Sequence, residues 1–163
     1  MNIALIGFRG AGKTTVCRLL ASRLNKKLIS VEDEMAKKAK LNASSLAKKY
    51  DARKLYEMES EVIEKISDFD ECIVDTGYGV VMRSENIINL KRSSLIILLT
   101  ADIKTITARI KRNRQDYISR TMPLLQEYEH RYRNAADYAI DVSRLSPEEI
   151  CDLISHYVQT EIQ

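Results

Sequence analysis

Short runs of apolar residues alternate along this chain with longer stretches in which apolar residues recur every three or four positions. The short runs predict β-strands, and the longer stretches predict helices between successive strands. We expect strands at residues 2–7, 28–31, 72–75, 95–100 and 138–141. Because strands and helices alternate, the pattern predicts an α/β fold whose parallel sheet is covered by helices on both faces.

The carboxyl ends of the strands are where a sheet of this kind binds its ligands. The segments to search for function are therefore residues 7–15, 30–34, 75–79 and the segment that follows Thr100. The chain has only five glycines, and all of them fall in the first and third of these segments. Glycine is thus confined to two places where a ligand is expected.

The first segment contains a nucleotide-binding motif. Residues 7–14, Gly-Phe-Arg-Gly-Ala-Gly-Lys-Thr, match the phosphate-loop pattern G-x-x-x-x-G-K-[ST] between a strand-like run and a helical pattern. In such a loop the backbone N–H groups face the phosphates, the lysine reaches the β- and γ-phosphates, and the hydroxyl binds Mg²⁺. We expect a nucleoside triphosphate to be bound by Gly10, Ala11, Gly12, Lys13, Thr14 and Thr15.

Length and composition fit one globular domain. The chain has 163 residues, of which 45% are hydrophobic and 30% charged, and no apolar run is long enough to cross a bilayer. We expect residues 1–163 to form a single domain. The chain starts with a core-type strand where a secretory signal would stand, so we expect a cytoplasmic protein. Cys17, Cys72 and Cys151 lie far apart among apolar residues, which favours buried thiols over disulfides or a metal site.

Two acidic residues follow the second predicted strand. Glu32 and Asp33 would face the phosphate loop, where one of them could take the proton of an acceptor hydroxyl or hold a metal-bound water. Acidic residues are also favoured in the first turn of a helix, so both could instead belong to a helix start. The sequence leaves these two interpretations open.

The third predicted strand ends in an aspartate and a glycine turn. Asp75 lies where nucleoside triphosphatases keep an aspartate near Mg²⁺, so Thr14 and Asp75 are our candidate metal residues. An aspartate before a turn is the alternative. Gly77, Tyr78 and Gly79 would let the backbone approach a substrate closely, or would simply form a tight turn.

The net charge of +3 includes one basic cluster, between Arg109 and Arg120. Its residues leave a helical pattern and become polar before Pro123, which predicts a mobile lid at about residues 110–122. Lid arginines can close over phosphates, neutralise transition-state charge and exclude water. A solvated basic surface or a nucleic-acid site is the alternative. No aromatic platform or nucleic-acid motif accompanies the cluster, so we expect no nucleic-acid partner.

Taken together, these features resemble shikimate kinases. The resemblance rests on the N-terminal phosphate loop, the acids after the second strand, residues 76–79 (Thr-Gly-Tyr-Gly, for Thr-Gly-Gly-Gly in the family) and residues 122–125 (Met-Pro-Leu-Leu, for Arg-Pro-Leu-Leu). It implies a three-layer P-loop kinase fold with a five-stranded sheet, and ATP with Mg²⁺ as cofactors. It also implies that Arg109 and the loop around Pro147 lie beside the adenine, and that Arg120 joins the site when the lid closes.

The acceptor side departs from the family pattern. By the resemblance, the aspartate that contacts the substrate hydroxyl aligns with Glu32, or with Asp33 if a one-residue gap is placed. The two arginines that hold the carboxylate of shikimate align with Tyr56 and Tyr128, and Tyr78 replaces a glycine. A phenol offers one neutral hydrogen bond where arginine offers two charge-assisted ones, so we expect these changes to weaken shikimate binding.

Two hypotheses of different classes follow. The first is an ATP-dependent kinase resembling shikimate kinase, which phosphorylates a hydroxyl of a small metabolite, either shikimate or another compound. The second is an ATP-binding regulatory or scaffold protein of the same fold that has lost kinase activity. A nucleotide or nucleoside kinase is a weaker possibility, since tyrosines can stack on bases. We expect a monomer that does not associate with membranes.

Overall fold

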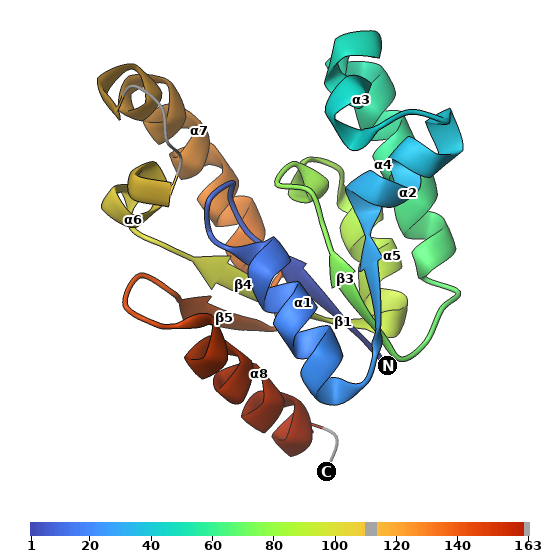
Figure 1. Ribbon diagram of the computed structural model, residues 1–163, viewed down its shortest axis with the longest axis vertical. Helices are drawn as coiled ribbons and strands as arrows, with labels where there is room; N and C mark the ends of the chain where they lie inside the picture. Colours follow the sequence, from blue (N-terminus) through green and yellow to red (C-terminus); the bar gives the residue numbers. More distant parts are fainter. Residues whose placement is uncertain (110–113, 162–163) are drawn as a thin grey trace.

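The protein forms one five-stranded parallel sheet, with strand order β2-β3-β1-β4-β5 (Figure 1). The computed structural model describes residues 1–109 and 114–161, and for residues 114–121 it describes the backbone alone. The strands are β1 (Asn2–Ile6), β2 (Lys27–Ser30), β3 (Cys72–Asp75), β4 (Ser94–Thr100) and β5 (Tyr138–Asp141). All five predicted strands are confirmed, with their bounds shifted by one residue at most.

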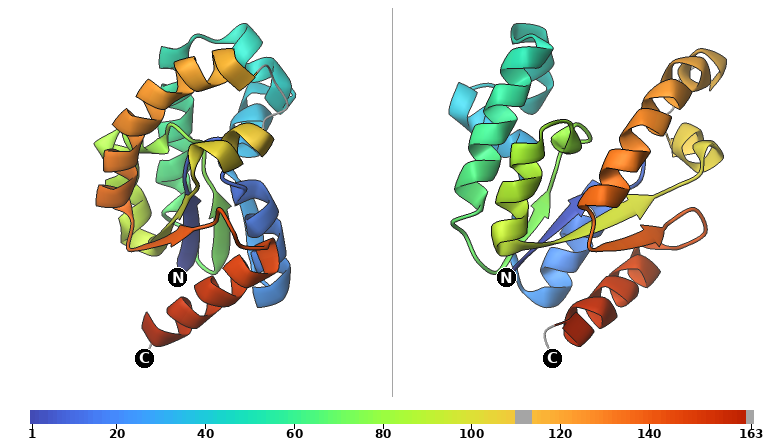
Figure 2. Two further views of the ribbon diagram at one scale, coloured as in Figure 1. Left: turned by 90° about the vertical axis from the view of Figure 1, so that its left-hand side faces the viewer. Right: turned by 180° about the vertical axis from the view of Figure 1, so that it is seen from behind.

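Helices cover both faces of the sheet and complete three layers (Figures 1 and 2). One face carries α1 (Lys13–Leu24) and α8 (Pro147–Glu161). The other carries α4 (Ala52–Ile66), α5 (Ser84–Ser93) and α7 (Arg114–Ala135). The shorter elements are α2 (Val31–Ala39), α3 (Ala43–Lys49), the 3₁₀ turn η1 (Val80–Met82) and α6 (Ile103–Arg109). Of these, α2 and α3 pack with α4.

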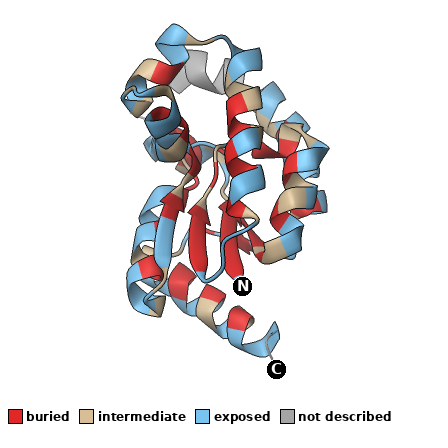
Figure 3. Cartoon of the chain, turned by 90° about the vertical axis from the view of Figure 1, so that its right-hand side faces the viewer, coloured by how far each residue is buried: buried red, intermediate tan, exposed pale blue. Residues whose placement is uncertain are grey.

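Successive side chains of a strand enter opposite layers of the core. On β1, Ile3 and Leu5 pack with α1 and α8, whereas Ala4 and Ile6 pack with the helices on the other face. Figure 3 shows the strands buried between helices whose outer faces are exposed. Each large apolar side chain buried in this way contributes about 1.5–3 kcal/mol. Burial on both faces explains why the strands read as continuous apolar runs.

The predicted lid coincides with the start of a long helix. Residues 110–113 lie outside the described residues, and the backbone from Arg114 onward belongs to the 22-residue helix α7. Pro123 lies inside this helix, where the sequence had indicated a polar segment ending before the proline. The side chain of Arg120 lies outside the described part of the chain, so its place on a lid stays a prediction.

A buried asparagine at the amino end of β1 joins three elements. The side-chain amide of Asn2 donates to the carbonyl of Phe69 at 2.9 Å and to the hydroxyl of Ser93 at 3.3 Å, and its oxygen accepts from the backbone N–H of Cys72 at 2.9 Å. Asn2 is completely buried. Because a buried polar group without a partner costs free energy, these bonds hold the amino edge of the sheet together.

We predict that Asn2→Ala lowers the free energy of unfolding by about 2–3 kcal/mol, because it leaves the buried N–H of Cys72 unpaired. Urea denaturation measures the change. Asn134→Ala makes the same chemical change at an exposed position of α7 and should stay within about 0.5 kcal/mol of the wild type. Equal stability of the two variants would contradict the role given to Asn2.

Candidate active site

A cleft of about 640 Å³ opens at the carboxyl edge of the sheet. The phosphate loop and the start of α1 line one side, and residues of α2, α3 and α4 line the other. The end of β3 and the turn after it contribute Asp75, Thr76, Gly77 and Tyr78. The segments that the sequence singled out therefore meet around one cavity, as expected for a parallel sheet.

The phosphate loop can form only with glycine at two of its positions. Gly12 adopts φ 91° immediately before the first residue of α1, and a Cβ there would lie 3.0 Å from a guanidinium nitrogen of Arg109. A Cβ on Gly7 would lie 2.5 Å from the carbonyl oxygen of Leu99 on β4. These close approaches place the amino end of α1, with its free N–H groups and partial positive charge, at the cleft.

Lys13 lies inside the curl of the loop. Its ammonium donates to the carbonyl of Gly7 at 2.6 Å and to the carbonyl of Phe8 at 3.2 Å, and the side chain is buried. Burial lowers the pKa of Lys13 to about 8, although the nearby carboxylate of Asp75 opposes this shift. A polyphosphate beside the ammonium would favour its charged form, so the loop fits such a ligand.

A hydroxyl and a carboxylate meet at the floor of the cleft. Thr14 donates a hydrogen bond of 2.8 Å from Oγ1 to Oδ2 of Asp75. Burial raises the pKa of Asp75, and the hydrogen bond from Thr14 opposes the shift. Both groups offer oxygen ligands, which suits Mg²⁺. Within the described residues no cluster of three or more His, Cys, Asp or Glu side chains could hold a metal, so Mg²⁺ would also need nucleotide oxygens and water.

The two residues expected beside the adenine lie in different surroundings. Arg109, at the end of α6, lines the cleft and donates from Nη1 to the carbonyl of Gly10 at 3.2 Å. This contact places its guanidinium against the phosphate loop. Pro147 is the first residue of α8 and does not line the cleft. Contact of either residue with adenine stays a prediction.

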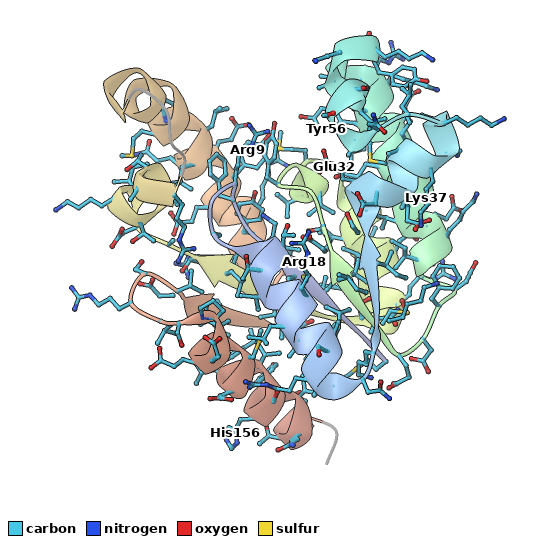
Figure 4. The ribbon with its side chains drawn as sticks, viewed as in Figure 1. Arg9, Arg18, Glu32, Lys37, Tyr56 and His156 are labelled. Carbon is cyan, nitrogen blue, oxygen red and sulfur yellow. The ribbon has the colours of Figure 1, made fainter. Side chains whose placement is uncertain are left out.

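Glu32 and Asp33 lie in the first turn of α2 and line the cleft. Ser30 caps the start of this helix, and its hydroxyl accepts from the backbone N–H of Asp33 at 3.2 Å. Figure 4 shows Glu32 across the cleft from Arg9 and Arg18, which come from the phosphate loop and α1. The two interpretations left open by the sequence are therefore compatible, because the acids occupy a helix start that faces the phosphate loop.

Aromatic side chains form a cluster beside the cleft. Phe8, Tyr78, Tyr128 and Tyr132 form an aromatic cluster whose neighbouring ring centroids lie 5.9–6.0 Å apart. Tyr78 lines the cleft, whereas Tyr128 is buried behind it. Burial, together with the hydrogen bond that the Tyr128 hydroxyl donates to Tyr56, raises the pKa of this hydroxyl. Tyr128 is thus an uncharged residue that packs behind the cleft.

The glycine turn after β3 accommodates side chains from α4. A Cβ on Gly77 would lie 2.7 Å from Oε2 of Glu59, and a Cβ on Gly79 would lie 3.1 Å from the ring of Tyr56. Gly77 lines the cleft, whereas Gly79 and Tyr56 do not. The structure therefore brings Gly77 and Tyr78 to the cavity and places Tyr56, Gly79 and Tyr128 in the layer behind it.

Glu59 is a cleft residue that the sequence reasoning missed. It is 8% exposed, and its Oε1 atom has no hydrogen-bond partner within the described structure. Burial raises the pKa of Glu59 to about 7, against the opposing charge of Arg83. A signal was present in the sequence, because Glu59 interrupts the apolar stripe of Met58, Val62 and Ile63 on α4.

Arg9 was also missed as an individual candidate, although it lies within the phosphate-loop motif. It lines the cleft with its guanidinium carbon 5.0 Å from the ring centroid of Tyr78, within cation–π distance. Its position links the phosphate loop to the aromatic cluster. No sequence signal separates it from the other variable positions of the motif.

Comparison with known proteins agrees with this geometry. The family model described as shikimate kinase matches residues 9–159. The chain belongs to the shikimate kinase family. Relatives named shikimate kinase are 34% identical over 154 residues in Caldicellulosiruptor saccharolyticus (90% of this chain, 89% of the relative) and 35% identical over 159 residues in Dehalococcoides mccartyi (94% and 90%).

Solved structures show the same fold. A shikimate kinase from Acinetobacter baumannii in complex with shikimate matches with a TM-score of 0.90 at 22% identity, covering 98% of this chain and 93% of that one. Shikimate kinases are phosphotransferases that act on an alcohol group and use ATP with Mg²⁺, so the P-loop kinase fold and these cofactors are confirmed. In the described part of the chain, no helix combines the length and apolar character needed to cross a membrane.

The buried carboxyl of Glu59 predicts a pH-dependent stability. Between its ordinary pKa of 4.5 and about 7, the folded chain holds a proton that the unfolded chain releases, so stability falls as pH rises through this range. At 1.36 kcal/mol per pKa unit the total loss is roughly 3 kcal/mol. Glu59→Gln removes the titrating carboxyl and with it this loss. The free energy of unfolding of the variant should therefore exceed that of the wild type by roughly this amount at pH 8 and equal it near pH 4.5.

Urea denaturation at a series of pH values tests this prediction. Glu64→Gln makes the same change at an exposed position of α4 and should run parallel to the wild type throughout. If the curves of Glu59→Gln and the wild type are also parallel, Glu59 is not the titrating group.

Proposed function

We propose that this protein is a kinase that transfers the γ-phosphoryl group of ATP to a hydroxyl of a small metabolite. The observation that carries the proposal is the arrangement of one cleft: Lys13 and the Thr14–Asp75 pair lie on one side, and Glu32 and Asp33 face them from α2. Phosphoryl transfer needs a clamped donor, neutralised charge and an acceptor hydroxyl placed in line. Each of these tasks has a candidate residue in the cleft.

On the donor side, the loop amides and Lys13 bind the phosphates. ATP supplies the phosphoryl group, and Mg²⁺ held by Thr14 and Asp75 would neutralise phosphate charge. Residues Gly10 to Thr15 form the rest of the phosphate site. Arg109 stabilises the loop through Gly10 and, with the loop around Pro147, flanks the adenine in this proposal. Arg120 completes the site when residues 110–122 close and exclude water.

On the acceptor side, Glu32 or Asp33 orients the hydroxyl and accepts its proton. Gly77 and Tyr78 contact the acceptor directly, because they line the cleft. Tyr56, Gly79 and Tyr128 shape it from behind, through the glycine turn and the aromatic cluster. The acceptor is shikimate or another small hydroxylated compound. We place the protein in the cytoplasm as a monomer, where ATP is available and its three buried thiols stay reduced.

We predict that Lys13→Ala abolishes phosphoryl transfer and leaves the fold intact, because the ammonium serves the phosphates and is costly to bury without them. ADP release in a coupled assay measures the rate, and circular dichroism checks the fold. Lys91→Ala, at an exposed position of α5, should keep full activity. Full activity of Lys13→Ala would refute the assigned phosphate site.

We also predict that Glu32→Gln lowers kcat by about 10²-fold or more, since it removes the carboxylate that accepts the proton. Asp33→Asn, the neighbouring change on the same turn, should lower kcat far less. ATP affinity, measured by calorimetry, should be unchanged in both variants. The reverse order of the two effects would assign the base to Asp33.

A protein that binds ATP but phosphorylates no acceptor is the alternative function. Calorimetry with ATP and Mg²⁺, followed by a coupled assay across polyols, sugar acids and nucleosides, separates the two. Heat of binding without ADP release for any compound would favour a regulatory or scaffold role. Turnover of one acceptor would exclude it.

A further inference from the structure

The most unusual group in the cleft is the buried carboxyl of Glu59. Glu59 comes from the middle of α4, more than nine-tenths of it is buried, and it still lines the cavity. Its Oε1 atom has no partner among the described residues, and Oε2 lies so close to the backbone of Gly77 that a Cβ there would be 2.7 Å away. A buried polar atom without a partner is costly. The partner is therefore expected to arrive with a ligand.

No cation of the described structure neutralises this carboxyl. The nearest basic residue that influences it, Arg83, donates to the hydroxyl of Ser60 at 3.3 Å and to Glu85 at 3.1 Å. Tyr56, one helical turn before Glu59, is a neutral phenol. Among the described residues, Glu59 thus lacks the ion pair that normally accompanies a buried acid.

Apart from Asp75, which is bonded to Thr14 on the side of the phosphate loop, the charges of the cleft fall into two halves. The basic residues Arg9, Lys13, Arg18 and Arg109 come from the phosphate loop, α1 and the end of α6, whereas the other acidic residues, Glu32, Asp33 and Glu59, come from α2 and α4. Figure 4 shows this separation, with Arg9 and Arg18 on one side and Glu32 and Tyr56 on the other. An anion bound near α4 would meet like charges, and a hydrogen-bond donor or cation would meet partners.

Arg9 is the cleft cation that contacts Tyr78, with its guanidinium carbon 5.0 Å from the ring centroid, and it is exposed. Its guanidinium lies over the ring of Tyr78 at the mouth, where solvent weakens its attraction for an anion. Glu59 is buried, so its contacts are stronger. Glu59 therefore has more influence than Arg9 on which compound binds.

We propose that Glu59 selects the acceptor: the compound that receives the phosphoryl group presents a hydroxyl or ammonium group to this carboxyl and carries no carboxylate. The inference rests on the proposed kinase function and narrows its substrate class. A hydroxyl or an ammonium satisfies Oε1 as a donor, whereas a carboxylate would place a second negative charge beside it. Tyr78 offers such a compound an apolar ring face.

The test uses the full chain with Mg²⁺ and a non-hydrolysable ATP analogue. Ligand-observed NMR screens a library of hydroxylated metabolites grouped into neutral, amine-bearing and carboxylate-bearing compounds. Calorimetry then compares matched sets: glucose, glucosamine and glucuronate, and shikimate with its hydroxymethyl and aminomethyl counterparts. We expect the ligands to come from the neutral and amine groups, and to bind about tenfold or more tightly than the matched carboxylate.

Two variants test whether Glu59 is responsible. At pH 8, where the Glu59 carboxyl is ionised, Glu59→Gln keeps the shape but removes the charge, so it should reduce the preference for the amine over the carboxylate by about tenfold, while Glu64→Gln should not change it. Tyr56→Arg places a guanidinium on the same face of α4 and should shift the preference toward the carboxylate. In turnover, the Glu59 effect should appear in KM more than in kcat.

The outcomes separate this inference from the kinase proposal. Preferred binding of neutral or amine compounds, with no ADP release when ATP replaces the analogue, supports the ligand class and refutes the kinase. Tight binding and turnover of a carboxylate compound support the kinase and overturn the inference. The inference is also overturned if Glu59→Gln leaves the preferences unchanged, if Arg9→Gln alone reverses them, or if no compound of the library binds.

Discussion

The buried ammonium of Lys13 is the constraint on which the rest of the site depends. Carbonyls of Gly7 and Phe8 hold it, and Asp75 lies close enough to favour its charge. Burial still lowers its pKa, so the folded chain keeps a destabilised charge at the carboxyl edge of the sheet. A polyphosphate bound beside this ammonium would stabilise its charged form. The conformation of the phosphate loop therefore suits an anionic ligand.

The opposite side of the cleft contains a buried acid, Glu59. Glu59 is a buried acid as Lys13 is a buried base, but each is too far from the other to form an ion pair in the described structure. Lys13 is satisfied by loop carbonyls, whereas one oxygen of Glu59 has no partner. The two buried groups therefore favour ligands of opposite character, and a phosphoryl donor and its acceptor fit this arrangement.

The sequence predicted the features that local physics determines. The strands were readable because burial on both faces demands apolar runs, and the phosphate loop because its glycines, lysine and hydroxyl lie within eight residues. Glu59 could not be assigned, since its role depends on α4 packing beside a turn that lies 18 residues further along the chain. Helix α7 continues through Pro123, where the polar pattern before the proline had suggested an interruption, and the lid at residues 110–122 stays a prediction.

The glycine turn after β3 shows how the acceptor wall depends on α4. Glu59 packs against Gly77, where a Cβ would lie 2.7 Å from Oε2, and Tyr56 packs against Gly79, where a Cβ would lie 3.1 Å from the ring. Tyr78, between them, projects into the cleft and joins the rings of Phe8 and Tyr128. The turn therefore takes its shape from α4 on one side and from the phosphate loop and α7 on the other. Acceptor preference can change through α4 side chains while the phosphate loop stays as it is.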